Sequence, residues 1–264
     1  MPRGPKGADS RGVVVLLHGS SGWGEYPVGH YARAFAAAGF TAFAVDSFGP
    51  RGIGQTGDNQ TQLSAHQMAR DAMAAKRFLV ARGFDPERFA VMGFSRGGYA
   101  ALIAADRTFL PDEQDRFKAA LPFYPACMAK SRTPRPASIV YMGLGEKDDY
   151  AGVKPCEQLA AAFRRAGGDI EVKVYSGAAH GWDGHPNNLT MINLRSVENY
   201  SQCVWIVEGD ATVTYRDRRR ANDAAFEQEL RGTCMRKGAS VWTNPTQKDA
   251  STKDAVAFVT RVLK

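Results

Sequence analysis

Gly93-Phe94-Ser95-Arg96-Gly97-Gly98 is the stretch of sequence that decides the fold, and it has the pattern Gly-x-Ser-x-Gly. It joins an apolar run, Arg88–Phe94, to a helix-like segment, Tyr99–Ala105. In that context the serine sits on a sharp strand-to-helix turn, where small neighbours let strand and helix pass closely. The free N–H groups at the helix start then face negative charge that develops near Ser95. The pattern predicts a nucleophilic serine, and its alternative is a glycine-rich turn with an idle serine.

Further apolar runs on both sides of this motif are typical of buried parallel strands. With the run at Arg88–Phe94 they are Val13–Leu17, Thr41–Val45, Ala119–Phe123, Ser138–Met142 and Ile170–Tyr175. Helical patterns lie between most of them, at Tyr31–Ala38, Ala65–Leu79 and Leu159–Ala166. Strands that alternate with helices form βαβ units, so we expect an α/β fold with a mostly parallel, doubly wound sheet.

The alternation breaks between residues 186 and 238. Cys203–Tyr215 resembles a hairpin with Gly209-Asp210 at its turn, and Arg218–Leu230 resembles a helix. Ser251 is then expected to cap a last helix. The segment is too short to bury a core of its own comfortably. We therefore expect one domain over residues 1–264, with an insertion at about 186–238.

Composition excludes several classes of protein. The chain has 264 residues, 44% of them hydrophobic and 23% charged, which is typical of a globular protein. No apolar run is long enough for a membrane span, and Met1–Arg11 is polar and unlike a signal peptide. Cysteines and histidines lack zinc spacing, so no metal is expected. The net charge of +7 and the arginines at 216 and 218–220 leave a non-catalytic basic binding protein as an alternative, although no nucleic-acid motif is present.

A nucleophilic serine needs a base and an orienting acid, which follow it as Ser…Asp/Glu…His at strand ends in this type of fold. His180 follows the sixth strand, and Asp148 follows the fifth, with Asp149 and Glu146 as alternatives. The backbone N–H groups of Arg96 and Ser20, with Ser21 as the alternate to Ser20, are expected to form the oxyanion hole. Among the other histidines, we expect structural roles for His18 and His30 and surface positions for His66 and His185.

Together these motifs resemble the dienelactone hydrolase family of the α/β-hydrolase superfamily. The matching stretches are Leu16–Gly19, Val45–Gly52, Gly93–Tyr99, Gly145–Tyr150 and Gly177–Trp182. The resemblance implies Ser95 as nucleophile, Asp148 as acid and His180 as base. Serine replaces the cysteine of the type enzyme, Gly19 replaces its glutamate, and its arginine after the catalytic histidine is missing. These departures favour a general carboxylic ester hydrolase that works through an acyl-enzyme without a cofactor.

The resemblance also implies that the two edge strands that usually precede Val13–Leu17 are missing. Aromatic and basic residues beside the motifs are expected to line a small pocket for short-chain or compact aromatic esters: Trp23, Phe48, Arg51, Tyr124, Tyr150 and Trp182. A serine peptidase, an acyltransferase and a catalytically inactive hydrolase fold remain alternatives. We expect a small-molecule ester as partner, with no nucleic acid and no membrane, and the oligomeric state stays open.

The four cysteines are Cys127, Cys156, Cys203 and Cys234. Neighbouring strands of this fold bring Cys127 and Cys156 to the same rim of the sheet, and Cys203 and Cys234 flank the inserted hairpin and helix. We therefore predict Cys127–Cys156 and Cys203–Cys234 disulfides and a periplasmic or secreted protein. Four reduced thiols in a cytoplasmic protein are the alternative.

Overall fold

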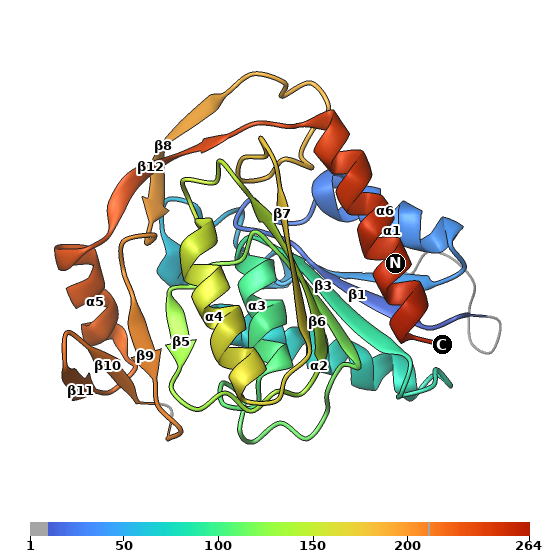
Figure 1. The fold of residues 1–264 in the computed structure, drawn as a ribbon, viewed down its shortest axis with the longest axis horizontal. Coiled ribbons are helices and arrows are strands. Elements are labelled where there is room, and N and C mark those ends of the chain that lie inside the picture. The colour runs from blue at the N-terminus through green and yellow to red at the C-terminus, as the bar shows by residue number, and fades with distance from the viewer. Residues whose placement is uncertain (1–9, 211) are drawn as a thin grey trace.

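A six-stranded sheet forms the centre of the molecule in the computed structural model, which describes residues 10–210 and 212–264 (Figure 1). Residues 1–9 of the polar segment Met1–Arg11 lie outside the described residues. Its strands are β1 (Val13–Leu17), β2 (Thr41–Val45), β3 (Phe89–Phe94), β4 (Ala119–Phe123), β6 (Ile139–Gly145) and β7 (Ile170–Tyr175). They run in the order β2-β1-β3-β4-β6-β7, and every neighbouring pair is parallel. The expected parallel, doubly wound sheet is confirmed.

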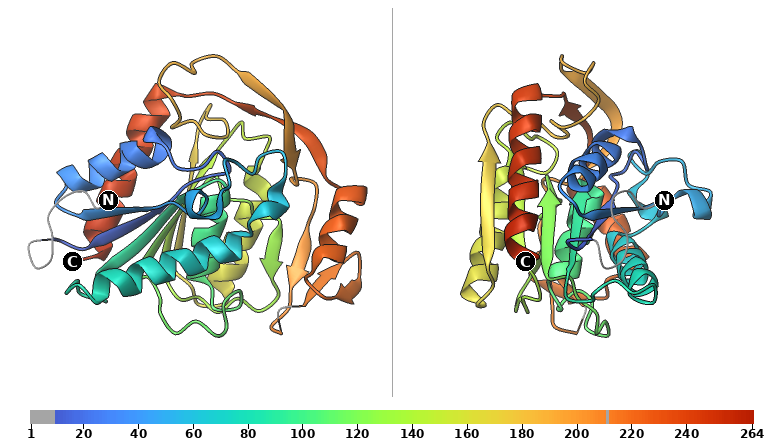
Figure 2. Two further views of the ribbon diagram at one scale, coloured as in Figure 1. Left: turned by 180° about the vertical axis from the view of Figure 1, so that it is seen from behind. Right: turned by 90° about the vertical axis from the view of Figure 1, so that its right-hand side faces the viewer.

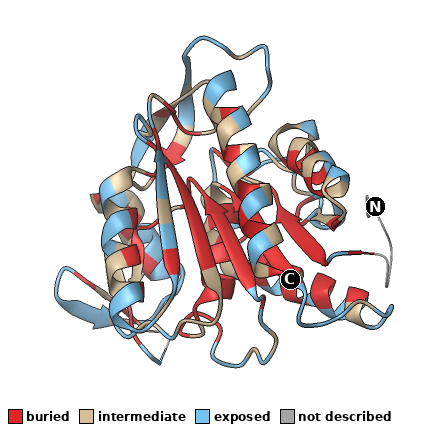
Figure 3. Ribbon diagram, turned by 45° about the vertical axis from the view of Figure 1, so that its right-hand side comes forward, coloured by how far each residue is buried: buried red, intermediate tan, exposed pale blue. Residues whose placement is uncertain are grey.

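Helices cover both faces of this sheet and bury β1, β3 and β4 completely, whereas the edge strand β7 keeps exposed residues (Figures 2 and 3). Val14 and Leu16 of β1 face a core completed by α1 (His30–Ala37) and α6 (Pro245–Val262). The alternate β1 residues face a second core with α2 (Ala65–Val80), α3 (Arg96–Ala105) and α4 (Val153–Arg165). The sandwich places the carboxyl ends of β3, β6 and β7 at one edge of the sheet, where the candidate site lies.

The start of the last helix differs from the expectation. Asn244, not Ser251, caps α6, and its side chain accepts a hydrogen bond from the N–H of Gln247. Ser251 is fully buried inside the helix, where its hydroxyl donates to the carbonyl of Lys248 and also bonds Tyr31 and Trp182. The proline at the first turn of α6 is compatible with a helix start, which explains why the helix begins earlier.

The inserted segment forms two small sheets and a helix. β9 (Trp205–Val207), β10 (Val213–Tyr215) and β11 (Arg218–Arg220) form an antiparallel meander, and β9 also pairs in parallel with β5 (Ala129–Ser131). β8 (Ile192–Asn199) and β12 (Arg236–Val241) form a two-stranded ribbon that leads into and out of this unit (Figure 1).

The expected helix over Arg218–Leu230 is wrong at its beginning. Arg216 and Asp217 both have positive φ, as in a two-residue hairpin turn, so Arg218–Arg220 folds back as β11. Helix α5 (Ala224–Thr233) starts only after Asp223, whose side chain accepts a hydrogen bond from the N–H of Phe226.

The buried residues of the inserted segment belong to the main core rather than to a separate one. Cys203, Val207, Phe226 and Leu230 lie in the same cluster as residues of α2 and α3. On this packing we propose that residues 186–238 are an insertion into a single domain. Within the part of the chain that the structure describes, no helix combines the length and apolar character needed to cross a membrane.

Candidate active site

Ser95 lies on the tight turn between β3 and α3, with φ 54° and ψ −114°. The turn depends on glycine at both sides, because the chain passes itself at very short range. A Cβ atom on Gly93 would lie 1.9 Å from the carbonyl oxygen of Gly97, and one on Gly97 would lie 2.5 Å from that of Leu17. This geometry lifts the serine side chain off the sheet edge and leaves it free to bond a neighbour.

Three side chains form a continuous hydrogen-bonded chain at this edge. The hydroxyl of Ser95 lies 2.9 Å from Nε2 of His180, and Nδ1 of His180 lies 2.9 Å from Oδ2 of Asp148. An ionised carboxylate only accepts hydrogen bonds, so Nδ1 carries the proton and donates a hydrogen bond to Asp148. Nε2 is then the acceptor for the hydroxyl of Ser95. The arrangement can remove a proton from the serine and stabilise the imidazolium that results.

Asp148 is held as a carboxylate despite its burial. Burial alone raises the pKa of this group, but the charge and hydrogen bond of His180 oppose it, as do the N–H groups of Ala151 and Tyr150. The net effect lowers the pKa of Asp148 below its ordinary value. The two alternative acids form hydrogen bonds to other groups. Asp149 accepts from the N–H of Ser240, and Glu146 accepts from Gly177.

Two tyrosine rings enclose the imidazole of His180. The ring centroids of Tyr124 and Tyr150 lie 4.9 and 4.7 Å from that of His180. The hydroxyl of Tyr124 donates a 2.6 Å hydrogen bond to Asp183, a fully buried carboxylate whose pKa is raised to about 6 by burial. The hydroxyl of Tyr150 donates to the carbonyl of Glu198 in β8. Each tyrosine ring is held by the hydrogen bond of its own hydroxyl, so both rings restrict the movement of the His180 imidazole.

The hydroxyl of Ser95 opens onto a cavity of about 500 Å³. Its walls come from α2, α3, the loop after β4, and the inserted segment. Residues of the predicted site in the lining are Ser20, Ser95, Arg96, Tyr124, Tyr150 and His180. The volume lies within the range that proteins use for small organic ligands.

Arg96 is the first residue of α3, so its N–H is one of the unpaired donors at the helix start. Its side chain runs along the cavity and donates to the carbonyl of Leu63 and to both the carbonyl and side chain of Gln60. Burial lowers the pKa of Arg96 to about 10, although the group still carries its charge at neutral pH. Ser20 lies in the same wall and Ser21, which is exposed, does not.

Four residues expected in the pocket lie elsewhere. Phe48 and Trp182 are fully buried in the two cores, Phe48 against the ring of His18 and Trp182 with its indole N–H on Ser251. Trp23 is 53% exposed, and Arg51 is held by a two-pronged ion pair with Asp71. Adjacency to a motif in the sequence does not fix the direction in which a loop side chain points.

Three of the other histidines lie where they were expected. His18 is fully buried and accepts a hydrogen bond from the N–H of Ser47, His30 bonds Thr252, and His185 is exposed. His66 corrects the prediction of a surface position. It lies in the cavity wall, with its ring 6.0 Å from that of Phe109, because α2 packs this face against α3.

The inserted segment supplies a wall of the cavity that sequence reasoning missed. Its contributions are Glu198, Tyr200, Trp205, Val207, Asn222, Phe226, Glu227 and Leu230. Trp205 and Val207 reach the site through the pairing of β9 with β5, whereas Glu198 comes from β8 and Phe226, Glu227 and Leu230 come from α5. None of them has a signal of its own in the sequence. The arginine cluster is on the far part of this unit, where Arg219 pairs with Asp210 and Arg220 with Glu229.

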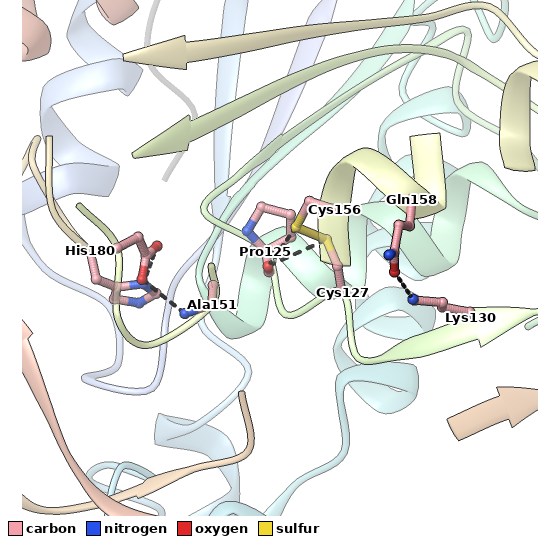
Figure 4. The surroundings of a disulfide bond; sticks show 8 residues. Pro125, Cys127, Lys130, Ala151, Cys156, Gln158 and His180 are labelled. Atoms are coloured by element: carbon pink, nitrogen blue, oxygen red, sulfur yellow. Dashed lines mark hydrogen bonds and ion pairs between the residues drawn. A yellow bond between two sulfur atoms is a disulfide. The ribbon is translucent and has the colours of Figure 1, made fainter. Parts of the chain in front are cut away.

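Both expected disulfides are present. Cys127–Cys156 joins the loop after β4 to the first turn of α4, beside the loop that carries Ala151 and close to His180 (Figure 4). Cys203–Cys234 joins the start of the inserted unit to the residue that follows α5. Among residues 10–210 and 212–264, no group of three or more histidine, cysteine or acidic side chains is arranged to hold a metal ion.

Comparison with known proteins places this geometry in a family. The model of the dienelactone hydrolase family matches residues 2–202. Esterase 2 of the Planctomycetes species Thermogutta terrifontis, in its apo form, superposes with a TM-score of 0.56 at 22% identity over 70% of this chain and 80% of the other. A Klebsiella pneumoniae protein proposed to be a dienelactone hydrolase gives 0.55 at 20% identity, over 70% and 84%. At these identities the likeness shows the fold.

No curated protein matched the chain. The match over residues 2–202 nevertheless shows that this chain belongs to the dienelactone hydrolase family.

Proposed function

We propose that the protein is a serine hydrolase that cleaves carboxylic esters through an acyl-enzyme intermediate. The observation that carries the proposal is the pair of 2.9 Å hydrogen bonds from Ser95 to His180 and from His180 to Asp148, in the wall of a cavity that Ser95 and His180 line. Membership of the dienelactone hydrolase family and a fold shared with an esterase support it.

In the first half of the reaction, His180 takes the proton of Ser95 as the hydroxyl oxygen attacks the ester carbonyl. Asp148 keeps the imidazole in the required tautomer and stabilises its positive charge. The N–H groups of Arg96 and Ser20 are the proposed donors to the oxyanion. His180 then gives the proton to the departing alcohol, which leaves the acyl group on Ser95. A water molecule repeats the attack, with His180 again as base, and releases the acid.

The test is activity-based labelling with a fluorophosphonate, followed by hydrolysis of p-nitrophenyl acetate. Ser95→Ala should lose labelling and about four to six decades in rate. Ser176→Ala, an exposed serine in the loop before His180, is the matched control and should retain both. Turnover by purified Ser95→Ala at the wild-type rate would exclude the serine mechanism.

We also propose that the protein works outside the cytoplasm. Two disulfides that close separate loops support this proposal, because such bonds are typical of proteins in oxidising surroundings.

A further inference from the structure

The part of the cavity beyond Ser95 is lined by aromatic rings from two directions. On the α2 and α3 side, the ring of His66 lies 6.4 Å from that of Tyr99 and 6.0 Å from that of Phe109. On the side of the inserted segment, Trp205 and Phe226 pack edge to face at 5.8 Å. All five side chains line the cavity. Ring surfaces on both sides favour a flat aromatic group between them.

Two polar groups among these rings, the Tyr99 hydroxyl and the His66 imidazole, stand out by their lack of hydrogen-bond partners within residues 10–210 and 212–264. Within the described residues, neither the hydroxyl of Tyr99 nor a ring nitrogen of His66 forms a hydrogen bond to a protein group. Neither group is completely buried, so a ligand in the cavity can reach both. The other cavity tyrosines differ. Tyr124 donates to Asp183, Tyr150 to Glu198, and Tyr200 also to Glu198. A tyrosine hydroxyl in such a setting usually finds a partner, so Tyr99 is placed to bond a ligand.

The protonation states of Tyr99 and His66 suit a neutral ligand that both donates and accepts a hydrogen bond. Burial raises the pKa of Tyr99, so its hydroxyl remains a donor at neutral pH. Burial lowers the pKa of His66, so its ring stays neutral and offers one donor and one acceptor. A ligand hydroxyl matches this set, because it can donate to the imidazole and accept from the phenol.

The two groups lie within reach of the reacting serine. The N–H of Tyr99 donates to the carbonyl of Ser95 over 2.9 Å, so the two residues are one turn apart on α3. That places their backbones about 6 Å apart along the helix. Ser95, Tyr99 and Phe109 line one cavity, so a ring joined to the ester by one or two carbons is the kind of group that we test beside Tyr99 while the carbonyl lies at Ser95.

We propose that this cavity holds a subsite for an aromatic ring that carries a hydroxyl group, with Tyr99 and His66 bonding the hydroxyl. The proposal rests on the proposed ester hydrolase function and specifies its substrates as esters with a hydroxylated aromatic ring. A site built around a hydroxyl discriminates against the analogue that lacks it, because its own polar groups then stay unpaired.

The experiment compares matched pairs of esters. One pair carries the ring in the acyl part, methyl 3-phenylpropanoate and its 4-hydroxyphenyl analogue. The other carries it in the alcohol part, 2-phenylethyl acetate and its 4-hydroxyphenyl analogue. Wild-type enzyme should prefer the hydroxylated member of at least one pair by about tenfold in kcat/KM. A ratio near one in both pairs would overturn the subsite.

Tyr99→Phe should bring the preferred ratio close to one, since the ring stays and only the hydroxyl is lost. The ratio cancels any loss of activity that affects both substrates alike. Tyr215→Phe is the control, because the hydroxyl of Tyr215 bonds Thr233 outside the cavity, and its ratio should stay at the wild-type value. An unchanged ratio in Tyr99→Phe would also overturn the assignment.

Failure of the subsite can be separated from failure of the proposed function. Calorimetry on Ser95→Ala measures binding of 3-(4-hydroxyphenyl)propanoate and 3-phenylpropanoate without turnover. Tighter binding of the hydroxylated acid, lost in Ser95→Ala/Tyr99→Phe, supports the subsite even if p-nitrophenyl acetate is not hydrolysed by the wild type. The alcohols 2-(4-hydroxyphenyl)ethanol and 2-phenylethanol are compared in the same way. Equal binding within both the acid pair and the alcohol pair, with normal hydrolysis of the acetate, would refute the subsite alone.

Discussion

The folded wild-type protein should lose stability as the pH rises, because Asp183 then ionises while buried. Replacing Asp183 by asparagine should remove this loss. Asp183 is fully buried, and burial raises its pKa from 3.8 to about 6. Only Oδ1 has a partner among the described residues, the hydroxyl of Tyr124, while Oδ2 has none. Ionisation therefore places a charge where few groups compensate it.

The raised pKa of Asp183 makes the folded protein less stable as the pH rises. Between pH 3.8 and about 6, folded protein holds a proton that the unfolded chain has released. The contribution of Asp183 to stability therefore falls as the pH rises through this window and stays low above it. The shift of about two units corresponds to about 3 kcal/mol at pH 7.5, from about 1.4 kcal/mol per unit, and to roughly half of that at pH 5.

Denaturant unfolding of wild type and Asp183→Asn, with disulfides intact, measures the effect at pH 5 and pH 7.5. The asparagine retains an oxygen for Tyr124 and cannot ionise, so the stability of the variant relative to wild type should increase by about 1.5 kcal/mol between the two pH values. Asp217→Asn, at an exposed turn, is the control for loss of a carboxylate. A difference between wild type and Asp183→Asn that is constant with pH would refute the reasoning.

Two further predictions concern the acid and the second disulfide. Asp148→Asn should reduce kcat by about 10⁴ because it favours the wrong tautomer of His180, whereas Asp149→Asn should cost far less; the reverse ranking in ester hydrolysis would transfer the role to Asp149. Replacing both Cys203 and Cys234 by serine should lower the stability by roughly 3–4 kcal/mol, as loop entropy predicts for a bond spanning 31 residues, in denaturant unfolding. Alkylation of four cysteines in denatured, unreduced wild type would contradict both bonds.

Local signals were sufficient to predict the sheet and the chain of polar groups at its edge. Ser95 follows from a motif with strict steric demands, and Asp148 and His180 follow from the rule that such groups come directly after strands. The inner strands β1, β3 and β4 are continuous apolar runs because both of their faces are buried. The edge strand β7 carries Glu171 and Lys173 and keeps exposed residues.

The cavity wall could not be predicted in this way. Trp205 reaches the site through pairing between β9 and β5, strands of three residues that are 76 positions apart in register, and Phe226 of α5 packs against it. Such short strands carry too little periodicity to be found in the sequence. Phe48 and Trp182 show the converse error, because adjacency to a motif does not say toward which core a side chain turns.

The attachment of the inserted segment limits how this enzyme can be shortened or recombined. β5 belongs to the main chain path before β6, yet its pairing partner is β9, and Val241 at the end of β12 forms a β-bridge to His180. Excising residues 186–238 would leave β5 as a bare edge open to pairing with other molecules. It would also shorten the strand that reaches the backbone of His180. The segment is thus not a cassette that can be exchanged between relatives on its own; a transplant must carry β5 and the bridge at Val241 with it.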